Sequence, residues 1–103
     1  MLVEFENDEL EELYVTALDA IRGKRKYPVE VIKQYKKKLA ILIGIHSVED
    51  LRPFKSLNFE YLKGDRKGQC SIRLNDQYRL IFVPTKDGSV QVLLIKEISK
   101  HYE

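Results

Sequence analysis

The stretch LKGDRKGQCSIRLNDQYRLIF, residues 62–82, carries the pattern that decides the fold. On both sides of its Asn-Asp pair, apolar residues alternate with polar ones: Cys70, Ile72 and Leu74, then Tyr78, Leu80 and Phe82. A period of two is typical of strands with one covered face. The stretch therefore predicts two antiparallel strands joined by a turn, with these six residues facing the core.

Two arginines interrupt the same strands. Alternation places Arg73 and Arg79 on the face opposite the core residues, and this face is expected to be open. Either they are ordinary solvent-exposed charges, or they line a site that binds an anion. A structural salt bridge is the alternative for Arg79, because its neighbours Ile81 and Val83 are expected to be buried.

The rest of the chain completes an α+β fold. A short apolar strand at 2–5 is followed by a helix. We expect Asp8 to cap the start of this helix and Gly23 to end it. A second helix runs from Pro28 to Gly44, and its apolar face is formed by Val29, Ile32, Tyr35, Leu39 and Leu42. Residues 84–89 are a turn, and 90–98 are apolar on both faces, as in a central strand. The order is β-α-α-β-β-β-β, with two helices on one face of a mostly antiparallel sheet.

The composition is that of one soluble globular domain spanning 1–103, with 44% hydrophobic and 33% charged residues. No apolar run is long enough for a membrane span, and no secretory signal is visible, so we expect a cytoplasmic protein. Cys70 is the one cysteine, which excludes an intrachain disulfide and leaves no metal-ligand spacing. We expect no cofactor and no metal.

Charges are strongly segregated, although the net charge is only +2. Residues 1–21 contain seven acids and no Lys or Arg, 22–38 contain eight Lys or Arg against one acid, and 52–82 contain seven against three. This segregation favours an anionic partner for one surface, such as nucleic acid. A dipolar surface without a partner remains the alternative.

The open face and the chain segments at its end form a candidate RNA site, made of Lys63, Arg66, Arg73, Arg79 and His101. Arginine binds phosphate oxygens bidentately, and lysine supplies a compact charge. Cleaving RNA without a metal requires activation of the 2′-hydroxyl, stabilisation of charge at phosphorus and protonation of the leaving oxygen. Lys63 and the arginines suit the second requirement.

Proton transfer is assigned to His101, because an unperturbed imidazole titrates near neutral pH, with Glu60 as a second candidate. Tyr102 can stack on a base, and Lys55 adds a further RNA-binding charge. His101 also lies three residues from the end of the chain and could belong to a frayed tail. His46 is interpreted as a surface or capping residue and Cys70 as a core residue.

Residues 62–82 resemble the HigB group of bacterial toxins within the RelE/ParE superfamily. The resemblance rests on a Lys-Gly-Asp-Arg turn, a Ser-Ile pair and a strand arginine, matched by Leu62, Lys63, Gly64, Asp65, Arg66, Gly68, Ser71, Ile72, Arg79 and Phe82. It implies the RelE-like fold and a metal-independent endoribonuclease that cleaves mRNA on the ribosome. It also implies a cognate antitoxin of the helix-turn-helix type, through which the toxin would contact DNA only indirectly.

Under this resemblance, Lys63 and Arg79 match the active-site lysine and arginine of the family, and Arg66 matches a neighbouring basic residue. The sequence departs from the pattern at Glu60, where the family usually has histidine, and at Cys70, where it has an aromatic residue. The tail is SKHYE, so either His101 or Tyr102 takes the place of the family's terminal histidine. A gyrase-inhibiting toxin of the ParE branch and an inactive homologue that acts as a binding module are the alternative functions.

Overall fold

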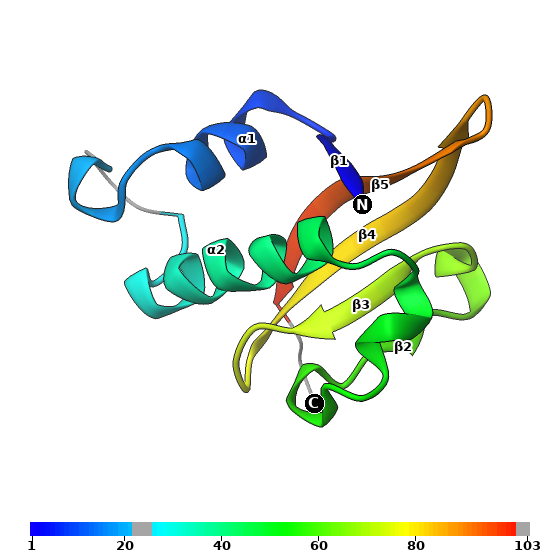
Figure 1. Ribbon diagram of the computed structural model, residues 1–103. Coiled ribbons are helices and arrows are strands. Elements are labelled where there is room, and N and C mark those ends of the chain that lie inside the picture. Colours follow the sequence, from blue (N-terminus) through cyan, green and yellow to red (C-terminus); the bar gives the residue numbers. More distant parts are fainter. Residues whose placement is uncertain (22–25, 101–103) are drawn as a thin grey trace.

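The computed structural model describes residues 1–21 and 26–100 and shows helices packed on one face of a five-stranded sheet (Figure 1). The main elements are β1 (Leu2–Phe5), α1 (Asp8–Val15), α2 (Val29–Gly44), β2 (Glu60–Tyr61), β3 (Cys70–Arg73), β4 (Tyr78–Asp87) and β5 (Val90–Lys100). One-turn 3-10 helices lie between them: η1 (Leu18–Ala20), η2 (Val48–Leu51), η3 (Lys55–Leu57) and η4 (Gly64–Arg66). The sheet order is β1-β5-β4-β3-β2, with only the β1–β5 pair parallel. The expected fold class and element order are confirmed.

Helix α1 begins and ends differently from the prediction. Asn7, not Asp8, is the N-cap, because its side chain accepts a hydrogen bond from the backbone N–H of Leu10 at 3.0 Å. The helix already ends at Val15, since Thr16 has extended dihedral angles. The Nζ of Lys36 on α2 satisfies the carbonyls of Tyr14 and Thr16 at this end. The predicted stop, residue 23, lies outside the described ranges.

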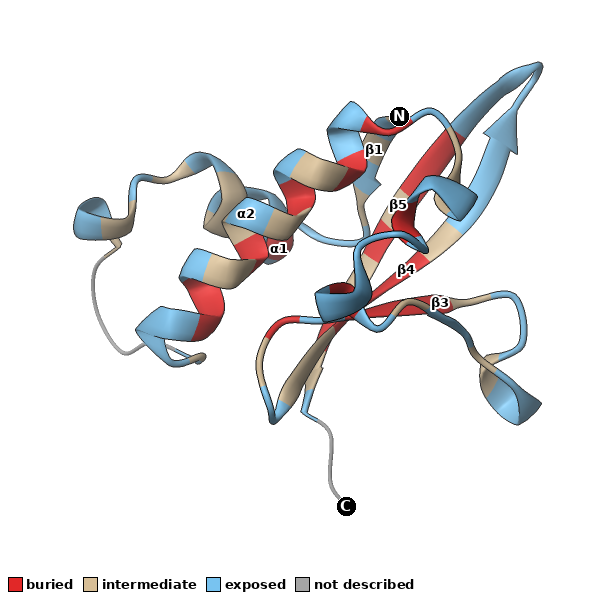
Figure 2. Cartoon of the chain, turned by 60° about the horizontal axis from the view of Figure 1, so that its bottom comes forward, coloured by how far each residue is buried: buried red, intermediate tan, exposed pale blue. Residues whose placement is uncertain are grey.

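Helix α2 packs its apolar face on the sheet, as its spacing predicts, with one correction. Its buried residues are Val31, Ile32, Tyr35, Leu39 and Leu42, whereas Val29 is 38% exposed. Val29 lies two residues before Val31, which is about 200° of rotation around the helix. It therefore points away from the stripe that continues through Tyr35 and Leu39. The buried segments of the helices and strands face one another in Figure 2.

Strand β5 contains a bulge, and core residues lie on its helix-covered face both before and after the bulge. Ile81 of β4 is paired with Glu97, while the next residue, Phe82, is paired with Ile95, so that Lys96 is an extra residue in β5. Ile95 and Ile98 are three apart and would lie on opposite faces of a regular strand. With the extra residue, both belong to the core cluster. Glu97 consequently lies on the open face.

The hairpin β4–β5 is longer than predicted. Its strands remain paired as far as Asp87 and Val90, so the turn consists of residues 88–89 instead of 84–89. Gly88 has φ of 65°, the left-handed conformation that the Asp-Gly signal predicts for such a turn. The outer part of the hairpin is exposed on both faces (Figure 2), and the alternation that reveals a half-buried strand is therefore missing there.

The core lies between α2 and the central strands and includes one buried polar contact. The hydroxyl of Tyr35 donates to the carbonyl oxygen of Leu10 at 2.7 Å, which ties α2 to α1. Phe82 of β4 is fully buried, and Leu51 and Leu57 extend the core beneath the loop before β2. Within the ranges that the structure describes, no helix has the length and apolar character needed to cross a membrane.

Candidate nucleic-acid interface

Arg79 lies near the start of β4, and neighbouring groups hold its guanidinium in place. Its Nε donates to the hydroxyl of Ser71 at 3.1 Å, and its Nη2 donates to the carbonyl oxygen of Asn58 at 2.9 Å. The carboxylate of Glu60 on β2 lies 3.5 Å from the same Nη2. The side chain is only 15% exposed. Arg79 is thus a fixed positive charge, as required of a group that binds an anion in one orientation.

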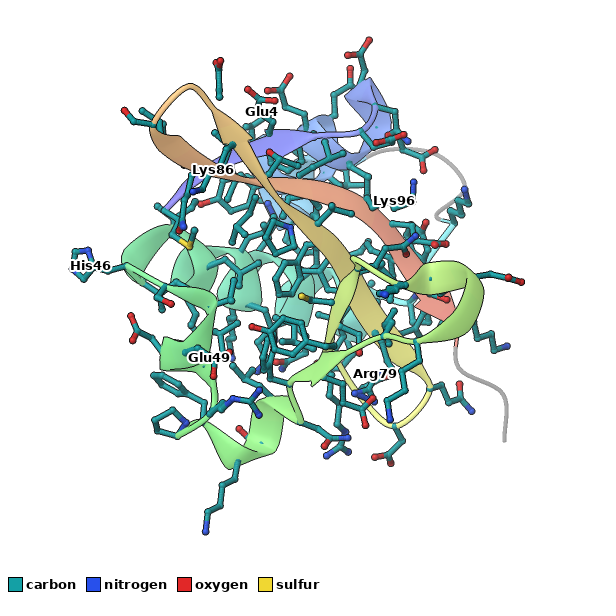
Figure 3. All side chains as sticks on the ribbon, turned by 90° about the vertical axis from the view of Figure 1, so that its right-hand side faces the viewer. Glu4, His46, Glu49, Arg79, Lys86 and Lys96 are labelled. Atoms are coloured by element: carbon teal, nitrogen blue, oxygen red, sulfur yellow. The ribbon has the colours of Figure 1, made fainter. Side chains whose placement is uncertain are left out.

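Arg79 and Arg73 line one open cleft of about 510 Å³, which we call the arginine cleft. Its lining residues are Lys55, Ser56, Asn58, Arg73, Asn75, Asp76 and Arg79. Three of these residues are cationic and one is acidic, so the cleft favours an anion. In Figure 3, Arg79 lies beside β3 and β4, far from Lys86 on the outer part of the hairpin.

The acid in the cleft is paired with one of the arginines. Asp76, in the turn between β3 and β4, forms an ion pair with Arg73, whose side chain is 45% exposed. An exposed pair of this kind contributes little net free energy, typically about 0–1 kcal/mol. Asp76 can therefore be displaced by another anion at small cost.

Asn58 connects the cleft to the loop before β2. It follows η3 and has φ of 46°, the one described non-glycine residue with a positive φ. Asparagine tolerates this left-handed conformation better than most residues. In this conformation, the carbonyl group of Asn58 accepts the hydrogen bond from Nη2 of Arg79. The backbone of this loop thereby helps to set the position of the arginine.

Arg66 and Lys63 lie in the turn before β3 but do not line the arginine cleft. The guanidinium of Arg66, in η4, contacts the carboxylate of Glu97 on β5 at 2.7 Å and the side-chain oxygen of Gln69 at 2.9 Å. The turn therefore reaches over the open face, as predicted. Lys63 is exposed just before η4, and no ion pair is found for it among the described residues.

The predicted residues include some that meet in the cleft, two that lie in the tail, and two that were not assigned to the site. Lys55, Arg73 and Arg79 meet in one cleft, whereas His101 and Tyr102 lie outside the described residues. His46 is exposed, and its backbone N–H donates to Asp50 at 3.1 Å, in agreement with a surface position in a capping segment. Cys70 is buried, and burial raises the pKa of its thiol to about 11, so it is a protonated core residue at neutral pH.

Sequence reasoning missed several residues that contact the predicted arginines, some at the cleft and one at the turn of Arg66. Ser71 is fully buried on the face opposite the core stripe, and its hydroxyl orients Arg79. A serine between Cys70 and Ile72 was visible as an alternating polar residue, but alternation carries no information about its partner. Asn58 offered a weak signal, because asparagine is enriched in left-handed turns. Glu97 offered no signal in the sequence, because the bulge at Lys96 decides on which face of the sheet its side chain lies.

Comparisons with known proteins agree on one family and fold. The sequence model of the HigB-like toxins, described as RelE-like toxins of the HigB type II toxin–antitoxin system, matches residues 3–95. Toxin HigB-1 of Vibrio cholerae serotype O1 is 39% identical over 82 residues, which cover 80% of this chain and 82% of that protein. A solved structure, the YoeB/ParE toxin from Agrobacterium tumefaciens, is 19% identical and superimposes with a TM-score of 0.55 over 99% of this chain and all of that one.

Proposed function

Since the chain belongs to the HigB-like toxins of type II toxin–antitoxin systems, we propose that it is an endoribonuclease that arrests translation by cleaving mRNA. The observation that carries this proposal is the arginine cleft. A rigidly held Arg79, a cross-strand Arg73 and Lys55 surround a space large enough for a nucleotide phosphate. The cleft is open on one side, as an RNA chain requires.

The proposed reaction transfers the phosphorus from the 5′-oxygen of one nucleotide to the 2′-oxygen of the preceding one. The 2′-hydroxyl loses its proton and attacks phosphorus, and the bond from phosphorus to the 5′-oxygen breaks. The products are a 2′,3′-cyclic phosphate and a 5′-hydroxyl. Negative charge grows on the phosphoryl oxygens during this step, and the guanidinium of Arg79 stabilises it, with Lys63 and Arg66 as further catalytic cations. Arg73 and Lys55 bind the flanking RNA backbone.

Proton transfer needs a base for the 2′-hydroxyl and an acid for the leaving oxygen. Glu60 is the candidate base, because its carboxylate lies 3.5 Å from Nη2 of Arg79 and its side chain is 54% exposed. We assign the acid to the tail, where His101 is the first candidate and Tyr102 the second. Their roles rest on the sequence alone, and the chemistry involves no metal or cofactor.

We propose that the ribosome presents the mRNA to the cleft, in keeping with the family resemblance, and that a cognate antitoxin neutralises the toxin. The antitoxin is expected to be a small helix-turn-helix protein that provides the contact with DNA. The segregated charges support two different partner surfaces, because the acids of α1 lie on an element separate from the arginine cleft.

The experiment is to incubate the purified protein with ribosomes that hold a defined mRNA and to map new 5′ ends. A second mRNA carries a single 2′-deoxynucleotide at the cleaved position. We expect cleavage of the first mRNA and none of the second at that position, because the nucleophile is missing. Equal cleavage of both would exclude the 2′-hydroxyl mechanism.

Two outcomes would assign the toxin to another class. Growth arrest with a DNA-damage response and intact ribosome-bound mRNA would indicate inhibition of gyrase. Harmless expression, without cleavage of either mRNA, would indicate an inactive homologue that acts as a binding module.

A further inference from the structure

A second hollow adjoins the arginine cleft and shares part of its wall. It has a volume of about 240 Å³ and is lined by Arg52, Phe54, Lys55, Asn58 and Phe59; we call it the aromatic hollow. Lys55 and Asn58 line both spaces. A ligand bound at Arg79 can therefore continue past Asn58 into the hollow without leaving the surface.

The lining of the aromatic hollow offers flat surfaces for stacking. Phe54 is 47% exposed, so a large part of this residue is accessible to a ligand. The guanidinium of Arg52 lies 5.4 Å from the ring centroid of Phe59. Nucleobases of single-stranded RNA stack on both kinds of group, the phenyl ring and the guanidinium plane.

Two of the groups that line the hollow, Phe59 and Arg52, are held in place by their neighbours. Phe59 is stacked on the buried Phe82, with ring centroids 6.4 Å apart, so it is anchored in the core. The Nε of Arg52 donates to Glu49 at 2.5 Å, and the other carboxylate oxygen of Glu49 accepts from the hydroxyl of Tyr61 at 2.5 Å. Glu49 does not line the hollow itself. The side of the hollow that Phe59 and Arg52 form is therefore pre-formed, which lowers the entropic cost of binding.

The junction between the two spaces is also specialised. Asn58 adopts its left-handed conformation there, and its carbonyl group accepts the hydrogen bond from Arg79. Backbone strain of this kind persists only where the surrounding structure enforces it, and it is frequent at functional sites. The residue that positions the catalytic arginine thus also shapes the wall of the aromatic hollow.

We propose that the aromatic hollow binds the nucleobase of the nucleotide next to the phosphate in the arginine cleft, with the base stacked on Phe54. This inference rests on the proposed function and adds a base-binding subsite to it. The occupant is single-stranded RNA, because cations supply the charge of the combined surface and aromatic rings supply its apolar part. An acidic peptide would match the cations but would leave the exposed ring of Phe54 unused.

The test is a titration of the isotope-labelled protein, followed by two-dimensional amide NMR spectra. The probes are the dinucleotide adenylyl-adenosine, ribose 5-phosphate as a base-free phosphate, and hexaglutamate as an acidic peptide. We expect the dinucleotide to shift the amide signals of both spaces, and ribose 5-phosphate to shift those of the arginine cleft alone. Hexaglutamate should leave the signals of Phe54 and Phe59 in place.

Variants identify the stacking residue. Phe54→Ala should weaken dinucleotide binding by about fivefold or more, as expected for the loss of one base–aromatic stack, and leave ribose 5-phosphate binding unchanged. Ile43→Ala is the matched control, because Ile43 is a similarly exposed apolar residue (41%) on α2 that lines neither space. Thermal unfolding of both variants establishes that they are folded.

The inference is overturned if the dinucleotide leaves the amides of the aromatic hollow unshifted at millimolar concentration, if Phe54→Ala binds it as tightly as the unaltered protein, or if hexaglutamate displaces it from the hollow. Failure of the proposed function has a different signature. In that case neither phosphate probe shifts the arginine cleft, and ribosome-bound mRNA stays intact.

Discussion

Arg73 and Arg79 are direct cross-strand partners in the β3–β4 pair, with both side chains on the face opposite the helices. Like charges in this position repel each other and destabilise a sheet. Here each arginine has an acid beside it, Asp76 for Arg73 and Glu60 for Arg79. These two acids offset the repulsion between the arginines. In the proposed function, the RNA phosphate supplies a further anion for the same pair.

Arg79→Lys keeps the positive charge but loses the guanidinium fork that Ser71 and Asn58 orient. We expect ribosome-dependent cleavage to fall by about 100-fold or more, the usual effect of removing one group that stabilises transition-state charge. Growth arrest on expression should be relieved. Lys86→Ala, on the exposed end of the β4–β5 hairpin, is the control and should remain fully toxic. Full toxicity of Arg79→Lys would place the active site elsewhere.

Lys63 and Lys67 flank η4, and both are exposed. Only Lys63 matches the active-site lysine of the resembling family. Lys63→Ala should therefore lower the cleavage rate about 100-fold, whereas Lys67→Ala should change it by less than about twofold. Both variants should unfold at the temperature of the unaltered protein. Equal rates for the two variants would show that the turn contributes no specific catalytic cation.

Arg66 is paired with Glu97 across the open face at 2.7 Å. If Arg66 acts on RNA, removing its cation should matter more than removing its partner. We expect Arg66→Ala to reduce the cleavage rate more than tenfold and Glu97→Gln to reduce it less than about threefold. Single-turnover cleavage on ribosomes measures both. Matching losses in the two variants would instead assign Arg66 to positioning the turn.

Alkaline pH should destabilise the fold through two buried groups. Burial raises the pKa of Cys70 from its ordinary value of 9.0 to about 11, and it also raises the pKa of the Tyr35 hydroxyl. In the unfolded chain both groups lose their protons at lower pH than in the folded protein. Their stabilising contribution is therefore complete below about pH 9 and is lost as the pH rises through the folded pKa values.

Urea unfolding at a series of pH values measures this loss. We expect a free energy of unfolding that is level between about pH 7 and 8 and falls by the order of 2 kcal/mol from the thiol alone by about pH 11. Cys70→Ala should show a shallower fall over the same range. An identical pH dependence in the variant would contradict the assignment to the buried thiol.

The fold was predictable where one face of an element is buried. Alternation in residues 70–82 and the helical spacing of Ile32, Tyr35 and Leu39 both report which side chains leave water. The outer part of the β4–β5 hairpin has no covered face, and its length was accordingly wrong. The end of α1 was missed because a lysine of α2, Lys36, satisfies its last carbonyls, a contact that local sequence cannot reveal.

Within the candidate site, the positions of Arg73 and Arg79 were predictable because both residues lie on strands of known phase. Arg73 and Arg79 meet in one cleft because both are on regular strands with the same open face. The position of Glu97 depends on the bulge at Lys96, and that of Asn58 on a left-handed backbone conformation. Both are tertiary features. The roles proposed for Lys63, Arg66 and the tail remain predictions.

The most direct test of the account compares the unaltered protein with Arg79→Lys on ribosomes that hold one defined mRNA, with 5′-end mapping as the readout. We predict new ends bearing a 5′-hydroxyl within the ribosome-bound codon for the unaltered protein, and about 100-fold slower formation of the same ends for the variant. Intact mRNA with the unaltered protein, or undiminished cleavage with Arg79→Lys, would contradict the claim that this chain cleaves RNA at the arginine cleft.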